Sequence, residues 1–409
     1  MRERGQLGNV FWAVVEHGTF SGATFAAQVL LARTLEPQAY GSFAMSFAVY
    51  VGSLQLQTAL FGDPVLVLAT ERFRDREPAY LSRVLRAYWA SWLALGLTIA
   101  LAARLFRGSD SDGDGEAFLA MGLALPFMGF VHLMRRFGYA QSSTKSAAKG
   151  ALGYALCVVG GMELLRRADW LSSASVYAVL GASSLAVGLV WWRRQRASTG
   201  ASAAPVTMRE AMACHWTYAR WGAMTALLAW VPLNSWYVTV PWVAPALGVA
   251  AAAQLRALFN LVQPIIQANA AIVAALMPAL TRQAASGLSM RWTGIALIGP
   301  ALYSAALFGL GPVAMRVLYG GAYEVDRTTL ALFSLLPVLH AAAALMRGRC
   351  LALGRPELPF QSTGFAALAS VVVGLPLCRS DGLTGAALGM LAGSCAQLAW
   401  LGVRLRALR

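Results

Sequence analysis

The sequence predicts an all-α membrane protein with about twelve transmembrane helices, arranged as two six-helix, pseudo-symmetric lobes around a central cavity. Charged residues make up only 12% of the 409 residues and hydrophobic residues 58%, whereas soluble domains carry about twice that charged fraction. Twelve apolar segments are each long enough to cross a bilayer, and basic residues alternate between the two sides of these segments. This composition argues against a water-soluble globular enzyme.

The net charge of +15 does not indicate a nucleic-acid-binding protein. The 33 Lys and Arg residues lie between apolar segments, whereas a nucleic-acid-binding protein gathers its basic residues on one face. We therefore expect no nucleic acid among the partners. The five cysteines contain no C-x-x-C pair, so neither a disulfide framework nor a zinc site is expected.

The first lobe is expected to comprise residues 1–197. Glu16 and His17 interrupt the first apolar segment, and no small-residue cleavage site follows it. We therefore expect a retained helix there rather than a signal peptide. The six predicted spans of this lobe are 9–32, 41–62, 84–104, 117–134, 148–165 and 173–192.

The second lobe is expected to comprise residues 209–409. It follows a polar segment, 198–208, that contains Ser198-Thr199-Gly200-Ala201-Ser202 and is typical of a flexible linker. The eighth span is long enough to tilt in the bilayer. The six predicted spans of this lobe are 211–233, 247–279, 292–312, 328–346, 358–377 and 383–403.

The basic residues also predict the orientation. If the chain crosses the membrane twelve times, 23 Lys and Arg residues fall on the side of the two termini and 8 on the opposite side. The acidic loop with Asp110 and Asp112 also falls on the opposite side. Because cytoplasmic loops carry the excess of basic residues, both termini are expected in the cytoplasm. We expect a multi-pass protein of the bacterial cytoplasmic (inner) membrane.

Short matches between the two halves indicate an internal repeat. Pro37-Gln38-Ala39-Tyr40-Gly41 precedes the second span and Pro245-Ala246-Leu247-Gly248 the eighth. Leu133-Met134-Arg135 ends the fourth span and Leu345-Met346-Arg347 the tenth. Six spans in each half keep both halves the same way up, so a pseudo-twofold axis would run along the membrane normal.

Three spans carry polar residues at steps of four, three and four, which places each set on one helical face. These sets are His17, Ser21, Thr24 and Gln28 in the first span; Ser46, Tyr50, Ser53 and Gln57 in the second; and Arg256, Asn260, Gln263 and Gln267 in the eighth.

Polar residues within a membrane face protein or water rather than lipid. Hydrogen bonding between helices is the favoured interpretation of the set in the second span. For the eighth span, with an arginine and two glutamines, we favour a water-filled cavity.

Two further charges, Glu16 and Arg220, lie at similar expected depths in the first and seventh spans. They form either a structural ion pair or part of a transport site. Arg256 has no acidic residue nearby in its own span, which favours a substrate ligand. The candidate substrate-binding residues are therefore Arg220, Arg256, Asn260, Gln263 and Gln267, and the candidate cavity-lining or coupling residues are Glu16, His17, Thr24, Gln28, Tyr50 and Gln57.

The sequence offers no candidate for catalysis. The histidines at 132, 215 and 340 are spaced unlike metal ligands, so no metal is expected. A phosphate-binding loop of the G-x-x-x-x-G-K-[ST] type and a nucleophile–base arrangement are both missing. We expect neither an enzyme nor a bound cofactor, apart from proton or sodium coupling at Glu16.

Three segments resemble the polysaccharide-type flippases of the multidrug/oligosaccharidyl-lipid/polysaccharide exporter superfamily. Residues 30–44 (LLARTLEPQAYGSFA) resemble the junction between the first two spans of these flippases. Residues 318–323 (LYGGAY) and 349–356 (RCLALGRP) resemble the segments before and after the tenth span. The similarity therefore extends over both halves of the chain.

The resemblance implies two lobes that alternate between inward-open and outward-open states. Its substrate would be a lipid-linked oligosaccharide, carried on polyprenyl pyrophosphate from the cytoplasmic to the outer leaflet for O-antigen, capsule or exopolysaccharide synthesis. Cavity arginines would bind the pyrophosphate. Besides the substrate and membrane lipid, a polysaccharide polymerase or co-polymerase is an expected partner. The lack of two further spans argues against the fourteen-span flippases of the cell-wall precursor.

Two alternatives stay open. The first is a multidrug/cation antiporter of the same architecture, which would need cavity carboxylates, whereas the intramembrane charges here are Glu16, Arg220 and Arg256. The second is a non-transporting membrane scaffold of a polysaccharide-assembly complex, against which the duplicated polar faces argue.

Overall fold

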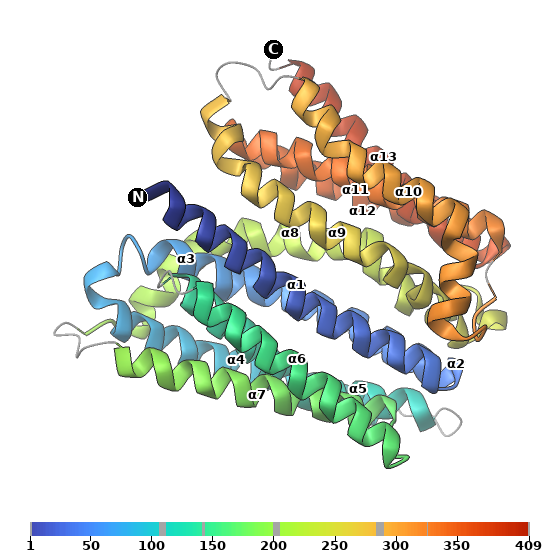
Figure 1. Ribbon diagram of the computed structural model, residues 1–409, viewed down its shortest axis with the longest axis horizontal. Helices are drawn as coiled ribbons and strands as arrows, with labels where there is room; N and C mark the ends of the chain where they lie inside the picture. Colours follow the sequence, from blue (N-terminus) through green and yellow to red (C-terminus); the bar gives the residue numbers. More distant parts are fainter. Residues whose placement is uncertain are drawn as a thin grey trace. The chain divides into compact units, whose positions relative to one another are not determined.

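The computed structural model describes residues 2–105, 112–140, 144–198, 205–283, 290–324 and 326–407. Within these ranges the chain is helical and has no strand (Figure 1). The α-helices are α1 Arg2–Thr34, α2 Pro37–Gln57, α3 Asp63–Leu68, α4 Glu77–Leu105, α5 Asp112–Ala140, α6 Thr144–Arg167, α7 Ser173–Ser198, α8 Met208–Val243, α9 Ala250–Gln283, α10 Met290–Tyr319, α11 Arg327–Ala352, α12 Glu357–Asp381 and α13 Leu383–Ala407.

The predicted helical membrane fold is confirmed. A π-helical turn at Thr58–Gly62 joins α2 to α3, so α2 to α13 supply eleven long helices besides α1. Each predicted span lies within one of them, except that the eighth begins at Ala250 rather than at 247. In the described residues, nine helices are long and apolar enough to cross a membrane. The other three long helices, α1, α8 and α9, carry Glu16, Arg220 and Arg256, respectively.

The described chain forms two compact units. Unit 1 comprises 1–28 and 49–226, and unit 2 comprises 29–48 and 227–409. Their boundaries fall inside α1, α2 and α8. The predicted linker 198–208 separates the sequence halves instead, and its residues 199–204 lie outside the described residues. The division into lobes at that linker and the central cavity between them stay predictions.

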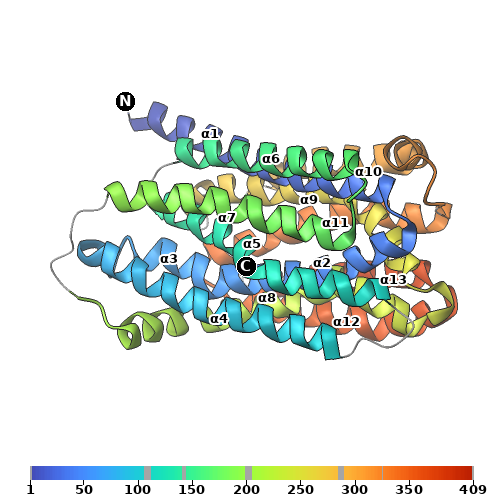
Figure 2. The same ribbon diagram turned by 90° about the horizontal axis from the view of Figure 1, so that it is seen from below.

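In unit 1, α5 packs against α4 and α7, and α6 packs against α7 (Figure 2).

The π-helical turn at Thr58–Gly62 is explained by Pro64 and by a contact from α8. Pro64 has no N–H to donate to the carbonyl of Leu60, four residues earlier, and its ring pushes that carbonyl away. The imidazole Nδ1 of buried His215, on α8, lies 3.0 Å from the Leu60 carbonyl oxygen instead. Its Nε2 lies 2.6 Å from the Tyr80 hydroxyl.

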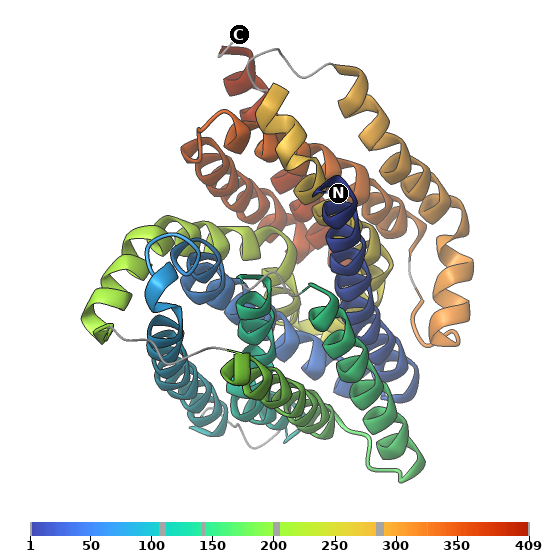
Figure 3. The same ribbon diagram turned by 60° about the vertical axis from the view of Figure 1, so that its left-hand side comes forward.

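In unit 2, α12 and α13 form an antiparallel pair, and α11 packs against α9, α10 and α13 (Figure 1, Figure 3). Gly382 makes the tight turn between α12 and α13 with a φ of 57°, a conformation that favours glycine. Asp326 caps α11, because its carboxylate accepts hydrogen bonds from the backbone N–H groups of Thr328 and Thr329.

The start of α2 lies against the residues that precede α9 in unit 2. A Cβ added at Gly41 would lie 2.2 Å from the carbonyl oxygen of Val249. Gly41→Ala is therefore expected to lower the free energy of unfolding by about 1–3 kcal/mol, as overpacking does. A lower thermal unfolding midpoint of the purified protein would report this change. Gly22→Ala is the control, because a Cβ there meets nothing within 4 Å; equal midpoints for both variants would contradict the prediction.

Candidate functional site

The polar face of α9 forms the candidate substrate site of unit 2. Arg256 is 1% exposed and Asn260 fully buried, while Gln263 is half-buried. The Arg256 guanidinium donates from Nη2 to the Gln263 side-chain oxygen at 3.2 Å. The predicted common face of these three residues is therefore present. Gln267, one turn further along α9, is half-buried.

Aromatic rings surround the Arg256 guanidinium. Its Cζ lies 4.8 Å from the ring centroid of Phe47 on α2, 5.5 Å from that of Tyr237 on α8 and 6.0 Å from that of Phe259 on α9. The quadrupoles of such rings attract a cation, and the rings keep it in a medium of low dielectric. Electrostatic attraction to an anion is strengthened in such a medium.

Tyrosines from α2 and α10 complete this site. The Asn260 side-chain amide donates to the Tyr40 hydroxyl at 3.1 Å, and the Tyr319 hydroxyl donates to the Ala257 carbonyl at 3.1 Å. Helices α2, α8 and α10 therefore converge on two turns of α9. A guanidinium held here, with hydroxyl and amide groups beside it, matches the donors that bind a phosphate or a carboxylate.

The charge of this site is positive. Every described acidic residue of unit 2 is exposed: Glu36, Glu324, Asp326, Glu357 and Asp381. Within the described part of this unit, Arg256 is the one charged side chain that is buried. The local electrostatics therefore favour an anion over a cation.

Among the acidic residues of unit 1 whose burial the structure describes, Glu16 is the buried one, and its partner differs from the predicted one. The carboxylate is fully buried and accepts from the Arg135 Nη2 at 2.9 Å and from the Tyr139 hydroxyl at 2.7 Å. The Glu16–Arg220 ion pair was therefore wrong. Arg135 and Tyr139 lie on α5, and the sequence does not indicate that α5 rather than α8 supplies the countercharge of α1.

Arg220 lies in an environment unlike that of Arg256. It is an exposed residue of α8 in unit 1, with its guanidinium Cζ 5.7 Å from the Trp221 ring centroid. Trp216 and Trp221 are also exposed. Arginine beside exposed tryptophans is typical of a membrane interface. The role of Arg220 as a substrate ligand stays a prediction.

Two other candidates of unit 1, Tyr50 and Gln57, join helices to one another. The Tyr50 hydroxyl lies 3.3 Å from the His132 Nε2, and Gln57 donates to the Gly129 carbonyl at 3.2 Å. Thr24 donates to the carbonyl of Phe20 within α1. Gln28 is buried and His17 half-buried. The contacts of Tyr50 and Gln57 are those of the helix-to-helix alternative, and the cavity-lining role of this set stays a prediction.

The sequence did not predict that His132 links Tyr50 to the Glu16–Arg135 ion pair. The His132 Nδ1 lies 3.3 Å from the Arg135 Nη1, so His132 connects the Tyr50 hydroxyl to the Glu16–Arg135 pair. The Arg135 guanidinium also lies over the Phe20 ring, 4.4 Å from its centroid. The available signal was that Glu16 needs a buried cation, but Arg135 lies at the predicted end of the fourth span, where basic residues are expected at the cytoplasmic side of the membrane.

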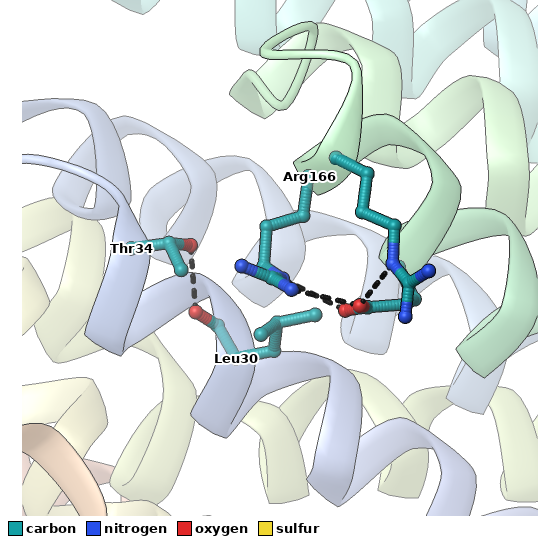
Figure 4. Close-up of polar contacts among 5 residues, drawn as sticks. Leu30, Thr34 and Arg166 are labelled. Atoms are coloured by element: carbon teal, nitrogen blue, oxygen red, sulfur yellow. Dashed lines mark hydrogen bonds and ion pairs between the residues drawn. The ribbon is translucent and has the colours of Figure 1, made fainter.

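An exposed ion pair on α6 provides a contrast with the buried one. The Arg166 guanidinium donates to both oxygens of Glu163 at 2.7 Å, and Arg167 donates to the same carboxylate at 2.8 Å (Figure 4). Figure 4 also shows the Thr34 hydroxyl donating to the Leu30 carbonyl of α1, at 2.7 Å. Exposed pairs of this kind contribute little to stability.

Comparisons with known proteins identify the fold. No protein-family model matches the sequence, and no curated protein matches it. An inward-facing multidrug resistance MATE family transporter of the MOP superfamily is similar in structure, with a TM-score of 0.74, 15% identity and coverage of 97% of this chain and 98% of that chain. The lipid II flippase MurJ in an inward closed conformation has a TM-score of 0.77 and 11% identity, with coverage of 97% and 87%.

A third similar structure is a MOP superfamily transporter from Pyrococcus furiosus Vc1. Its TM-score is 0.67 and its identity 14%, with coverage of 98% of this chain and 96% of that chain. For that protein, the reverse polarity of the binding pocket suggests a different function. The chain therefore has the fold of the MOP superfamily transporters, and its own residues must decide the substrate.

Proposed function

We propose that the chain is a flippase of the secondary transporter type. It moves a polyprenyl-pyrophosphate-linked oligosaccharide from the cytoplasmic to the outer leaflet by alternating access, for the synthesis of a surface polysaccharide. The observation that carries the proposal is the Arg256 guanidinium of α9, which is 1% exposed and is surrounded by aromatic rings that include Phe47 and Tyr237. The similar fold of the lipid II flippase MurJ supports a lipid-linked substrate.

The chemistry of Arg256 suits this substrate. A guanidinium is always charged and donates paired hydrogen bonds that match phosphate oxygens. In the mechanism we propose, the diphosphate replaces Gln263 as acceptor when the site opens, and Asn260 and the tyrosine hydroxyls contact the remaining oxygens. The prenyl chain stays in the lipid because its transfer into water is unfavourable. Both termini lie in the cytoplasm in this proposal, and the membrane is the bacterial inner membrane.

Coupling to protons or sodium at Glu16 is a second part of the proposal. The carboxylate is paired with Arg135 and accepts from Tyr139, which gives it a structural role. A coupling role additionally requires that this pair opens during the cycle. A polysaccharide polymerase or co-polymerase is the partner we propose for handover of the flipped substrate.

The multidrug antiporter is the competing function, because the MATE transporter is similar over nearly the whole chain. A pocket for cationic drugs needs a carboxylate, and the described acidic residues of unit 2 are all exposed. The positive charge of the α9 site therefore favours the flippase over the antiporter.

Reconstitution distinguishes these functions. The purified protein in liposomes is expected to flip a fluorescent polyprenyl-diphosphate disaccharide, measured as fluorescence protected from an impermeant quencher. We expect no transport of ethidium under a proton gradient. Ethidium transport without flipping would replace the proposal by the antiporter. No transport of either compound by correctly folded, reconstituted protein would replace it by the scaffold.

A further inference from the structure

A second cationic site lies in unit 2, on helices that do not carry Arg256. Arg347, on α11, donates from Nη1 to the side-chain oxygen of Gln397 on α13 at 2.9 Å. The Gln397 amide nitrogen donates in turn to the Thr363 hydroxyl of α12 at 3.4 Å, and that hydroxyl donates to the Pro359 carbonyl at 2.8 Å. These bonds fix the Gln397 amide with its oxygen toward the guanidinium.

The partner of Arg347 is neutral and satisfies little of its hydrogen-bonding capacity. A guanidinium has five N–H donors, and the described residues give Arg347 one acceptor and no ion pair. Gln397 is 7% exposed and Thr363 3% exposed, whereas Arg347 itself is half-buried. Charged groups within a membrane protein are costly unless they are paired or hydrated.

The arginine that corresponds to Arg347 in the internal repeat has an acidic partner. The match Leu133-Met134-Arg135 with Leu345-Met346-Arg347 aligns Arg347 with Arg135. Arg135 is neutralised by the Glu16 carboxylate. In unit 2 the amide Gln397 is the acceptor, so the second arginine keeps its charge available for a ligand.

An apolar cluster closes the site on one side. Cys350, Leu358, Leu401 and Leu405 form a buried cluster with Met346 and Leu353 packed against it. Cys350 and Leu401 lie about one helical turn beyond Arg347 and Gln397 on the same helices. The side of the site toward the C-terminal ends of α11 and α13 is therefore apolar. His340, two turns before Arg347 on α11 and half-buried, lies on the same helical face.

We propose that Arg347 and His340 form a binding site for a phosphate group between α11, α12 and α13. The Gln397 amide positions the guanidinium, while the donors that do not contact Gln397 bind the phosphate oxygens. The phosphate belongs either to a soluble molecule or to the headgroup of an anionic lipid, because both present the same oxygens. The proposal depends only on contacts within unit 2 and is independent of transport through Arg256.

The test measures how phosphate changes the thermal unfolding midpoint of the purified full-length protein. One arm adds inorganic phosphate at constant ionic strength, and the other adds phosphatidylglycerol to phosphatidylcholine nanodiscs. Arg347→Gln is expected to weaken the apparent affinity at least 10-fold for the probe to which the wild type responds. Arg349→Gln is the matched control, because it removes the same charge two residues later, on another face of α11, and should respond like the wild type.

A second variant decides the result if Arg347→Gln does not fold. Gln397→Glu places a carboxylate of nearly the same shape beside Arg347. It is expected to abolish the response to the probe and to keep or raise the unfolding midpoint without the probe. A response in the phosphate arm identifies a soluble ligand, and a response in the lipid arm alone identifies a headgroup. A wild type that responds to neither probe, or a Gln397→Glu variant that responds like the wild type, would overturn the proposal.

Discussion

Arg256→Gln is expected to reduce transport of the lipid-linked substrate at least 10-fold. The variant removes the buried charge of the α9 site but keeps a polar side chain. Charge-assisted hydrogen bonds to phosphate contribute about 1.5–3 kcal/mol each, and a factor of ten corresponds to about 1.4 kcal/mol. The loss of one or two of them therefore accounts for this decrease. Initial flipping rates in liposomes that contain equal amounts of protein measure it.

Two further variants separate charge from geometry. Arg256→Lys keeps the charge but not the forked donors, so it should transport at a rate between those of the wild type and Arg256→Gln. Arg316→Gln, at an exposed position of α10, removes the same charge elsewhere in unit 2 and should leave the rate unchanged. Wild-type flipping by well-folded Arg256→Gln would show that the guanidinium does not bind the substrate.

Glu16→Gln is expected to lower the free energy of unfolding by about 3–5 kcal/mol, as breaking a buried ion pair does. The variant leaves the Arg135 guanidinium, whose side chain is 13% exposed, without its countercharge. The measurement is the thermal unfolding midpoint of the purified protein. Double replacement Glu16→Gln with Arg135→Gln should restore part of the loss, since it removes the uncompensated charge.

Two controls make this result specific. Tyr139→Phe removes one hydrogen bond to the same carboxylate and should cost about 1 kcal/mol. Glu163→Gln removes the exposed ion pairs of α6 and should leave the midpoint unchanged. If Glu16→Gln is as stable as Glu163→Gln, the ion pair with Arg135 is not structural. If Glu16 also couples transport to protons, the variant must lose the pH dependence of flipping.

The helices could be predicted because each leaves a local signal. Apolar length fixed the spans, and the α11 cap at Asp326 is local as well. The π-helical turn at Thr58–Gly62 was not predicted. Its cause, Pro64, is visible in the sequence, but a proline in a helix gives a kink as readily as a π-helical turn. The buried imidazole of His215 contacts the Leu60 carbonyl from 155 residues further along the chain. The sequence pattern alone does not indicate this contact.

The candidate site was predictable in part for the same reason. The common face of Arg256, Asn260 and Gln263 follows from helical periodicity within α9. The rings of Phe47 and Tyr237 come from α2 and α8, so they could be found only once the packing was known. The partner of Glu16 was missed because expected depth in the membrane favoured Arg220, whereas Arg135 lies at the predicted end of the fourth span. Periodicity specifies which residues share a face, and packing specifies what that face meets.

The affinity of the protein for polyprenyl diphosphate, compared with its affinity for uncharged polyprenol, tests the role of Arg256 most directly. Both lipids share the same chain, so the difference reports binding of the diphosphate alone. We expect the wild type in nanodiscs to bind the diphosphate at least 10-fold more tightly and Arg256→Gln to bind both lipids equally. If Arg256→Gln keeps the full preference for the diphosphate, the anion is bound elsewhere and the assignment of the α9 site is wrong.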